Sequence, residues 1–244
     1  MDSPPDIAST QGIFPAPGVR TSYKHAWKQL WKYFIELLLV SIVSFLISLP
    51  SIGLSVDELG NFVGERFSLD LLIIHFEGPW GYFMFALAYL LLLEWPIEYG
   101  AAFAFLLGAR NEKLEVKRMF EVFKNWGNAV LANILQVVII GMGFVFLIVP
   151  GIIFACKLAF VPYLIVDRRM DAVAAIKKSW SMTKGHAWKV FGIGCLALFV
   201  ALLGLLLIGV GIVVSIMWIR LASATLYWSV AASMQETEPS ASDA

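Results

Sequence analysis

Long uncharged runs alternate with short charged segments along this chain. The uncharged runs cover residues 37–56, 78–93, 125–156 and 190–219, and each consists mostly of apolar side chains. A helix needs about 20 apolar residues to cross the roughly 30 Å hydrocarbon core of a bilayer. The third and fourth runs, of 32 and 30 residues, are longer than one such helix needs. The pattern therefore predicts an all-α, polytopic membrane protein.

Turn-forming residues divide these runs into six predicted transmembrane helices. A Val-Pro-Gly sequence at 149–151 interrupts the third run, and a Gly-Val-Gly sequence at 209–211 interrupts the fourth. Such sequences favour tight turns. The second run continues past Glu94 and Glu98 to Gly108, which predicts one long, interrupted helix. The predicted helices pair as three hairpins and cover residues 33–50, 78–108, 129–149, 151–166, 190–208 and 210–233.

The basic residues predict how these helices are oriented. Fifteen of the eighteen Lys and Arg residues fall within 20–32, 110–124 and 168–189. Basic residues near helix ends are retained on the cytoplasmic side of a membrane. Six spans then put both termini in the cytoplasm. The predicted parts are a disordered tail at 1–19, a membrane domain at 20–234 with an outer loop at 51–79, and a disordered acidic tail at 235–244.

Composition excludes several classes of function. The chain is 59% apolar and 15% charged, against roughly 45–50% and about 25% in soluble globular domains. Its formal charge is zero, so nothing indicates a nucleic-acid partner. Cys156 and Cys195 lack CxxC spacing and the histidines are scattered, so no disulfide, metal site or cofactor is predicted. We find no catalytic motif and expect a protein that is not an enzyme; a membrane-embedded enzyme is the least favoured alternative.

A short basic and aromatic sequence recurs before three of the predicted helices. His-Ala-Trp-Lys occurs at 25–28 and again at 186–189, and a looser copy, Phe-Lys-Asn-Trp, occupies 123–126. The repeat predicts a unit of one amphipathic helix on the cytoplasmic face, a span outward, a turn and a span inward. Alternatively, interface anchors recur by composition alone, because Trp and Lys favour headgroup depth. The predicted anchors are Trp27, Lys28, Trp126, Trp188 and Lys189.

Four ionisable residues fall inside predicted helices that return to the cytoplasm: Glu94, Glu98, Lys157 and Arg220. A charge near the bilayer centre costs at least roughly 2.5–3.5 kcal/mol, so these residues are expected to pair inside the bundle. One interpretation is a structural ion-pair network that fixes which helices pack together. The other is a polar cavity that binds a charged or zwitterionic ligand and is lined by all four residues.

Prolines near these charges favour the cavity. Pro96 and Pro162 each remove an amide donor and leave a carbonyl without its helical partner, here that of Leu92 and Leu158. Broken helices are tolerated in membranes where the exposed backbone meets protein or a water-lined cavity. The predicted helix breaks are Pro96, Pro150, Gly151 and Pro162.

Segment 167–189 predicts an amphipathic helix, with Asp171 as its N-cap and Gly185 as its stop. Ser179 and Trp180 lie on the face opposed to its lysines. Such a helix is expected to rest on anionic headgroups. Docking of a cytoplasmic partner is the alternative.

Three sequences in order indicate a family: residues 146–153 (FLIVPGII), 162–167 (PYLIVD) and 174–186 (AAIKKSWSMTKGH). Together they resemble the YciC-like membrane proteins, which are similar to the membrane domain fused to some glycerophosphodiester phosphodiesterases. The resemblance covers roughly residues 95–230. It implies a multi-span protein of the prokaryotic cytoplasmic (inner) membrane and supplies no catalytic residues.

The sequence thus predicts a protein that binds or moves a lipid or a small amphipathic or zwitterionic ligand through a charged intramembrane cavity. The alternative is a structural or interaction subunit that recruits a cytoplasmic partner through its basic inner surface. Expected partners are membrane lipids, with a cytoplasmic protein or a second copy of the chain as further candidates.

Overall fold

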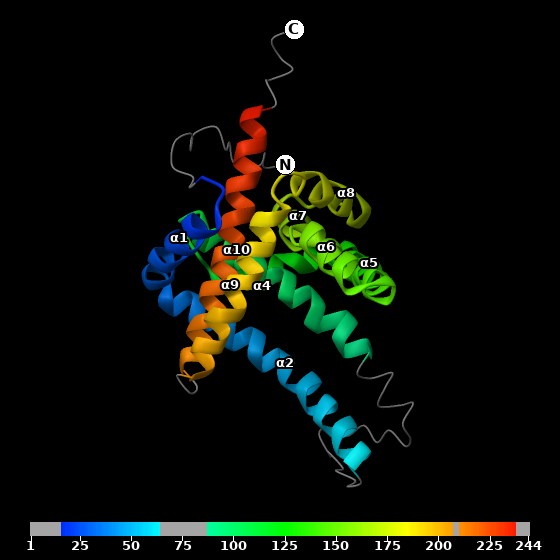
Figure 1. Ribbon diagram of the computed structural model, residues 1–244. Coiled ribbons are helices and arrows are strands. Elements are labelled where there is room, and N and C mark those ends of the chain that lie inside the picture. Colours follow the sequence, from blue (N-terminus) through cyan, green and yellow to red (C-terminus); the bar gives the residue numbers. More distant parts are fainter. Residues whose placement is uncertain (1–15, 64–86, 207–209, 238–244) are drawn as a thin grey trace.

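The computed structural model describes residues 16–63, 87–206 and 210–237, and every regular element within these ranges is a helix. The all-α prediction is confirmed for this part of the chain (Figure 1). The elements are α1 (Val19–Lys32), α2 (Phe34–Val63), the π-helix η2 (Leu90–Glu94), α4 (Trp95–Ala109), the 3₁₀-helix η3 (Val116–Asn125), α5 (Trp126–Phe146), α6 (Ile148–Leu158), α7 (Val161–Asp167), α8 (Ala172–Met182), α9 (Ala187–Leu206) and α10 (Val210–Thr237).

The core forms around α4, which packs against α2, η3, α7 and α10. Twelve of the 15 residues of α4 are buried, as expected for a helix that is apolar on all sides. Gly100 allows η3 to cross α4 closely, since a Cβ at this position would lie 1.9 Å from the Met119 carbonyl oxygen. The central position of α4 brings polar side chains from distant segments to its surface.

Five described helical segments are long and apolar enough to cross a membrane, and the bent α1–α2 pair could supply a sixth. The outer ones are little covered by protein: only 17% of the apolar window is buried in both Val116–Phe146 and Ala187–Leu206. Large apolar side chains such as Val145 and Leu206 are more than three-quarters exposed. Water would solvate such surfaces poorly, so the chain has the character of a membrane protein.

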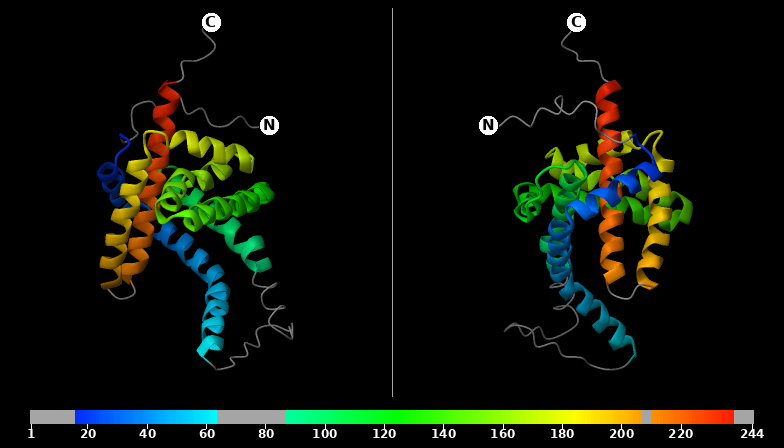
Figure 2. Two further views of the ribbon diagram at one scale, coloured as in Figure 1. Left: turned by 45° about the vertical axis from the view of Figure 1, so that its right-hand side comes forward. Right: turned by 90° about the vertical axis from the view of Figure 1, so that its left-hand side faces the viewer.

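A short helix precedes a long helix three times, as α1–α2, η3–α5 and α8–α9. The long helices α5 and α9 pack against the helices that follow them, α6 and α10, and α2 packs against α4. Figure 2 shows that the α5–α6 hairpin lies at a steep angle to the α9–α10 hairpin rather than parallel to it, and α6 packs against α9. The α1–α2 junction bends by 95°.

The first predicted helix is longer than expected. Its predicted end at residue 50 is wrong, because Pro50 lies inside α2, which continues to Val63. Proline removes one backbone hydrogen bond, and this loss does not stop the apolar helix. The predicted outer loop at 51–79 therefore begins as helix, and residues 64–79 lie outside the described ranges. The tails predicted at 1–19 and 235–244 are also mostly outside them, although α1 begins at Val19 and α10 ends at Thr237.

The break between the third and fourth predicted helices lies earlier than expected. Leu147 is the extended residue between α5 and α6, with φ −167° and ψ 152°, and Pro150 and Gly151 lie in the first turn of α6. Proline is tolerated there because first-turn amides have no helical acceptor. Gly151 instead allows α5 and α6 to pack closely, since a Cβ at this position would lie 2.6 Å from the Phe144 ring. Neither residue is therefore the helix break.

Pro162 does mark a break. It lies in the first turn of α7, and the chain leaves α-helical hydrogen bonding between Leu158 and Val161. Pro96 lies at the equivalent place in α4, directly after the π-helix η2. A π-turn inserts an extra residue into a helix and is frequent at functional sites. The interrupted second helix is thus confirmed over its described part, Leu87–Ala109.

Candidate functional site

Two groups of charged residues lie where α4, α7 and α10 meet. The first is a pair, Glu98 on α4 and Arg220 on α10, which we call the open pair. The second contains Arg110, Asp167 and Tyr227, which we call the closed network. Both join segments that are far apart in the sequence.

The open pair is held by a single hydrogen bond. Arg220 Nη2 donates to Glu98 Oε1 at 2.9 Å, and the guanidinium carbon lies 5.9 Å from the centre of the Phe105 ring. The side chains of Arg220 and Glu98 remain 33% and 41% exposed. Each ion therefore keeps hydrogen-bonding capacity that the other does not use.

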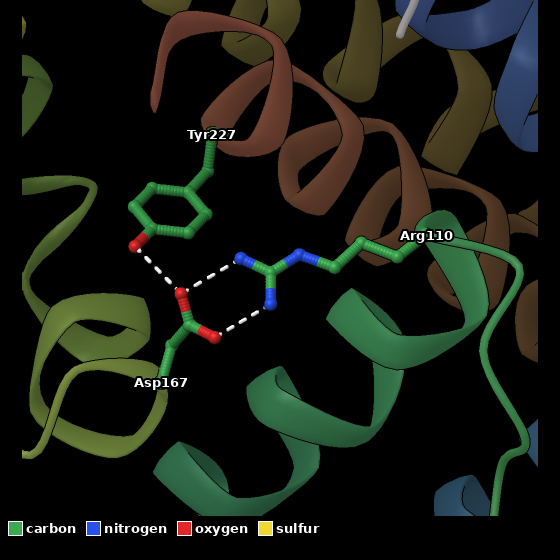
Figure 3. A network of polar contacts seen from close by, with 3 residues as sticks. All are labelled: Arg110, Asp167 and Tyr227. Atoms are coloured by element: carbon green, nitrogen blue, oxygen red, sulfur yellow. Dashed lines mark hydrogen bonds and ion pairs between the residues drawn. The ribbon is translucent and has the colours of Figure 1, made fainter. Parts of the chain in front are cut away.

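The closed network is more fully satisfied. Arg110 makes two parallel hydrogen bonds to Asp167, at 2.6 Å to Oδ1 and 2.8 Å to Oδ2, and the Tyr227 hydroxyl donates to Oδ2 at 3.1 Å (Figure 3). The Arg110 and Asp167 side chains are only 16% and 11% exposed. The Tyr227 ring stacks on Tyr163 with centroids 4.9 Å apart.

Burial alone would lower the pKa of the Arg110 guanidinium. The hydrogen bonds and attraction from Asp167 outweigh burial and raise the pKa above its ordinary value. Arg110 therefore stays charged, and a bidentate pair of this kind is both strong and directional. The closed network ties the end of α4 to α7 and α10.

The other two predicted site residues do not join the open pair. Lys157 on α6 places its Nζ 4.9 Å from the centre of the Trp180 ring on α8, a cation–π contact. Glu94 ends the π-helix, and its Oε2 is buried with no hydrogen-bond partner among the described residues. No ion pair within the described ranges includes either residue. Of the predicted four-residue cluster, Glu98 and Arg220 form an ion pair and Lys157 contacts Trp180 instead, whereas Glu94 lies four residues before Glu98 without an ion-pair partner among the described residues.

The two carbonyls that the prolines leave without helical partners are satisfied by side chains. Trp126 Nε1 donates to the Leu92 carbonyl at 3.1 Å, and Gln136 Nε2 donates to the Leu158 carbonyl at 3.0 Å. Tyr99 in turn donates to Gln136 Oε1 at 2.5 Å. These carbonyls meet protein, which is one of the two environments expected for them. The prolines therefore do not by themselves support a water-lined cavity.

A groove of about 410 Å³ lies between α9 and α10 beside Trp27 of α1, and none of the four predicted charges lines it. Its other lining residues include Leu203, Gly204, Val214 and Trp218. The groove is thus apolar and separate from the open pair.

The predicted interface anchors occupy unlike environments. Trp188 is 83% exposed. Trp27 instead lines the groove, and Trp126 donates a hydrogen bond to the Leu92 carbonyl. The identical tetrapeptides are not structurally equivalent, because residues 25–28 lie inside α1 and residues 186–189 span the start of α9. Lys28 is exposed and Lys189 is half-buried.

A domain family described as "Domain of unknown function (DUF7847)" matches residues 89–243, well over half of the chain. The chain belongs to the DUF7847 family. The match includes every residue of the open pair and the closed network, whereas α1 and α2 precede it. Neither the curated proteins nor the solved structures contain a match to this DUF7847 member.

Sequence reasoning missed the closed network. Arg110 belongs to the basic segment 110–124 that predicts the cytoplasmic side, and Asp167 begins the segment 167–189 that predicts an amphipathic helix. The predicted topology holds a signal, because Arg110 and Asp167 directly follow predicted helices, 78–108 and 151–166, that both return to the cytoplasm. An Arg and an Asp at one level within a bundle are expected to pair.

Proposed function

We propose that this DUF7847 protein is a YciC-like protein of the prokaryotic inner membrane with six spans in three hairpins. The three short helices α1, η3 and α8 would lie on the cytoplasmic face, with both termini. Three features support this topology: the repeated order of short helix, long helix and return helix, the apolar lengths of the helices, and the basic segments between the hairpins.

Amine labelling tests the topology. Lys117 on η3 and Lys177 on α8 are exposed, so an impermeant amine reagent should modify them only after cells are broken. Modification of either lysine in intact cells would contradict the six-span arrangement.

For its activity, the DUF7847 chain is proposed to bind or move a zwitterionic or amphipathic molecule at the open pair. The supporting observation is the exposure of Arg220 and Glu98, which lie in the middle of long apolar helices yet keep 33% and 41% of their side chains uncovered. Charges at this depth are costly when they face lipid tails. A ligand that carries both an anion and a cation would satisfy the unused donors of Arg220 and the unused oxygen of Glu98.

Glu94 adds to the acidic side of this proposed site. It precedes Glu98 by four residues, and its Oε2 has no hydrogen-bond partner in the described part of the chain. A buried carboxylate oxygen that lacks a donor is costly, and a ligand amine or a bound proton would relieve the cost. The proposed ligand therefore has its cationic group on the α4 side and its anionic group on the α10 side.

A mass-spectrometric census of what co-purifies with the protein tests this function. The comparison is between the wild type and the double variant Glu98→Gln with Arg220→Gln, which removes both charges together and leaves neither ion unpaired. The matched control is Lys113→Gln with Glu115→Gln, an exposed pair 88% and 51% uncovered. A zwitterionic or amphipathic compound should accompany the wild type and the control but not the open-pair variant. Equal retention in all three would contradict the proposal.

The alternative function is an interaction subunit, and α8 carries the observation that favours it. Lys177 and Lys184 are exposed, while Ser179 and Thr183 on the opposite side donate to the Lys157 carbonyl at 2.7 and 3.5 Å. The helix is thus fixed to the bundle with its lysines outward. A stoichiometric soluble protein in the same census, lost when these lysines become Gln, would favour this alternative.

A further inference from the structure

One face of α1 gathers cationic and aromatic side chains. Arg20, Lys24, Trp27, Lys28 and Trp31 are all exposed, and their spacing places them within one stripe along a helix of 3.6 residues per turn. The remaining sides of α1 contribute buried residues, among them Tyr23, Ala26 and Leu30. We call these five exposed residues the α1 stripe.

The stripe carries no compensating negative charge. No acidic residue occurs anywhere in α1, and no ion pair in the described part of the chain includes Arg20, Lys24 or Lys28. Its three cations therefore attract an anion without local repulsion. Clustered Lys and Arg residues on an amphipathic helix bind anionic headgroups, and tryptophan favours the headgroup level of a membrane.

An apolar groove opens directly beside the stripe. Trp27 belongs to both, and its ring lies 4.8 Å from that of Trp218 on α10. Below them the groove follows the α9–α10 crossing past Leu203 and Val214. Its volume of about 410 Å³ falls in the range of roughly 300–1,000 Å³ typical of small-molecule sites.

The groove exists because small residues bring α9 and α10 together at its floor. A Cβ at Gly204 would lie 2.2 Å from Ser215 Oγ and 2.7 Å from the Gly211 carbonyl oxygen. Such close crossings of membrane helices use small residues. Larger side chains, among them Val200, Leu203, Val214 and Trp218, line the groove beside this crossing.

We propose that the α1 stripe and this groove form one binding site for an anionic phospholipid, with its headgroup phosphate on Arg20, Lys24 and Lys28 and one acyl chain in the groove beneath Trp27. The cations select the anionic headgroup, and the apolar slot requires an acyl chain. This site is separate from the open pair, so either one can fail without the other.

The test is a native mass-spectrometry titration of the delipidated full-length protein. The probes are phosphatidylglycerol, phosphatidylcholine with the same acyl chains, and glycerophosphoglycerol, which has the headgroup without the chains. The wild type and the Glu98→Gln, Arg220→Gln variant, whose open pair can hold no zwitterionic lipid, should both retain one phosphatidylglycerol in preference to phosphatidylcholine and should not retain glycerophosphoglycerol. Equal retention of the two lipids would overturn the selectivity, and retention of the chain-free headgroup would overturn the role of the groove.

Two variants separate the parts of the site. The triple change Arg20→Gln, Lys24→Gln, Lys28→Gln should weaken phosphatidylglycerol binding about a hundredfold, at roughly a factor of five for each cation. The matched control removes three charges from α8 instead, by Lys177→Gln, Lys178→Gln and Lys184→Gln, and should bind like the wild type.

Val214→Trp should fill the groove and weaken phosphatidylglycerol binding while the cationic stripe stays intact. Unchanged binding in both the triple variant and Val214→Trp would overturn the proposal. So would a triple variant that loses no more affinity than the α8 control.

Discussion

The open pair and the closed network both hold an Arg–carboxylate contact against α4, yet they differ in nearly every property that decides what such a contact does. Arg110 and Asp167 share two hydrogen bonds, accept Tyr227 as a third partner and are 16% and 11% exposed. Glu98 and Arg220 share one hydrogen bond and are 41% and 33% exposed. The closed network is buried and its hydrogen bonds are made within the protein, so it can only hold helices together. The open pair is partly exposed and keeps hydrogen-bonding groups that a ligand can use.

The closed network should be the more sensitive of the two to loss of one partner. Asp167→Asn leaves the Arg110 charge buried without a counterion, and we expect a loss of about 3–5 kcal/mol of stability. Thermal unfolding of the purified protein in detergent measures this loss. Replacement of both partners, by Arg110→Met with Asp167→Leu, should recover most of it because no charge is then left unpaired. An Asp167→Asn protein as stable as the wild type would contradict a structural role.

The open pair should respond less strongly. Glu98→Gln weakens one hydrogen bond to a charged group, so we expect a loss of about 1.5–3 kcal/mol at most. Charge reversal then tests direct contact: Glu98→Arg and Arg220→Glu should each lower the yield of folded protein, and the double variant should restore it. If the double variant restores nothing, the two side chains do not pair directly.

Without the Tyr227 hydroxyl, the closed network is reduced to an Arg–carboxylate pair like the open pair. Tyr227→Phe deletes the hydroxyl that donates to Asp167 at 3.1 Å but keeps the ring against Tyr163. We expect a loss of about 1.5 kcal/mol, the lower end for a hydrogen bond to a charged group, visible as a lower unfolding temperature without any change in co-purified ligand. A Tyr227→Phe protein that lost the ligand would show that the closed network is part of the ligand site.

Lys157 provides the smallest expected effect. Its cation–π contact with Trp180 is worth about 0.5–1 kcal/mol, so Lys157→Met should lower stability only slightly. Ligand retention should be unchanged, because Lys157 contacts α8 rather than the open pair. Loss of the co-purified ligand in the Lys157→Met variant would show that Lys157 is part of the ligand site.

Much of the fold follows from spacing along the chain. The uncharged runs locate the long helices, and Pro162 and the Pro96 region mark two of their interruptions. The cost of an unpaired charge in a membrane predicts a partner for Glu98 inside the bundle, and Arg220 is that partner. These predictions succeed because the length and position of an apolar run can be measured along the sequence without knowing how the helices pack.

What the sequence did not predict depends on rotation about the helix axes and on local packing. Lys157 lies inside a long apolar helical segment as predicted, but its side chain contacts Trp180 rather than the open pair. The hairpin break falls at Leu147 rather than at Pro150, because proline fits the first turn of α6 as well as it fits a turn. Two identical tetrapeptides adopt different positions because each packs against different neighbours.

Chemical accessibility distinguishes the two ion pairs most directly. A membrane-permeant carbodiimide applied to native membranes, followed by peptide mass spectrometry, reports which intramembrane carboxyl groups a small molecule can reach. We predict modification of Glu98 and protection of Asp167, which Arg110 and Tyr227 cover. Modification of Asp167 at the same rate as Glu98, or protection of both, would contradict the distinction between an open and a closed pair.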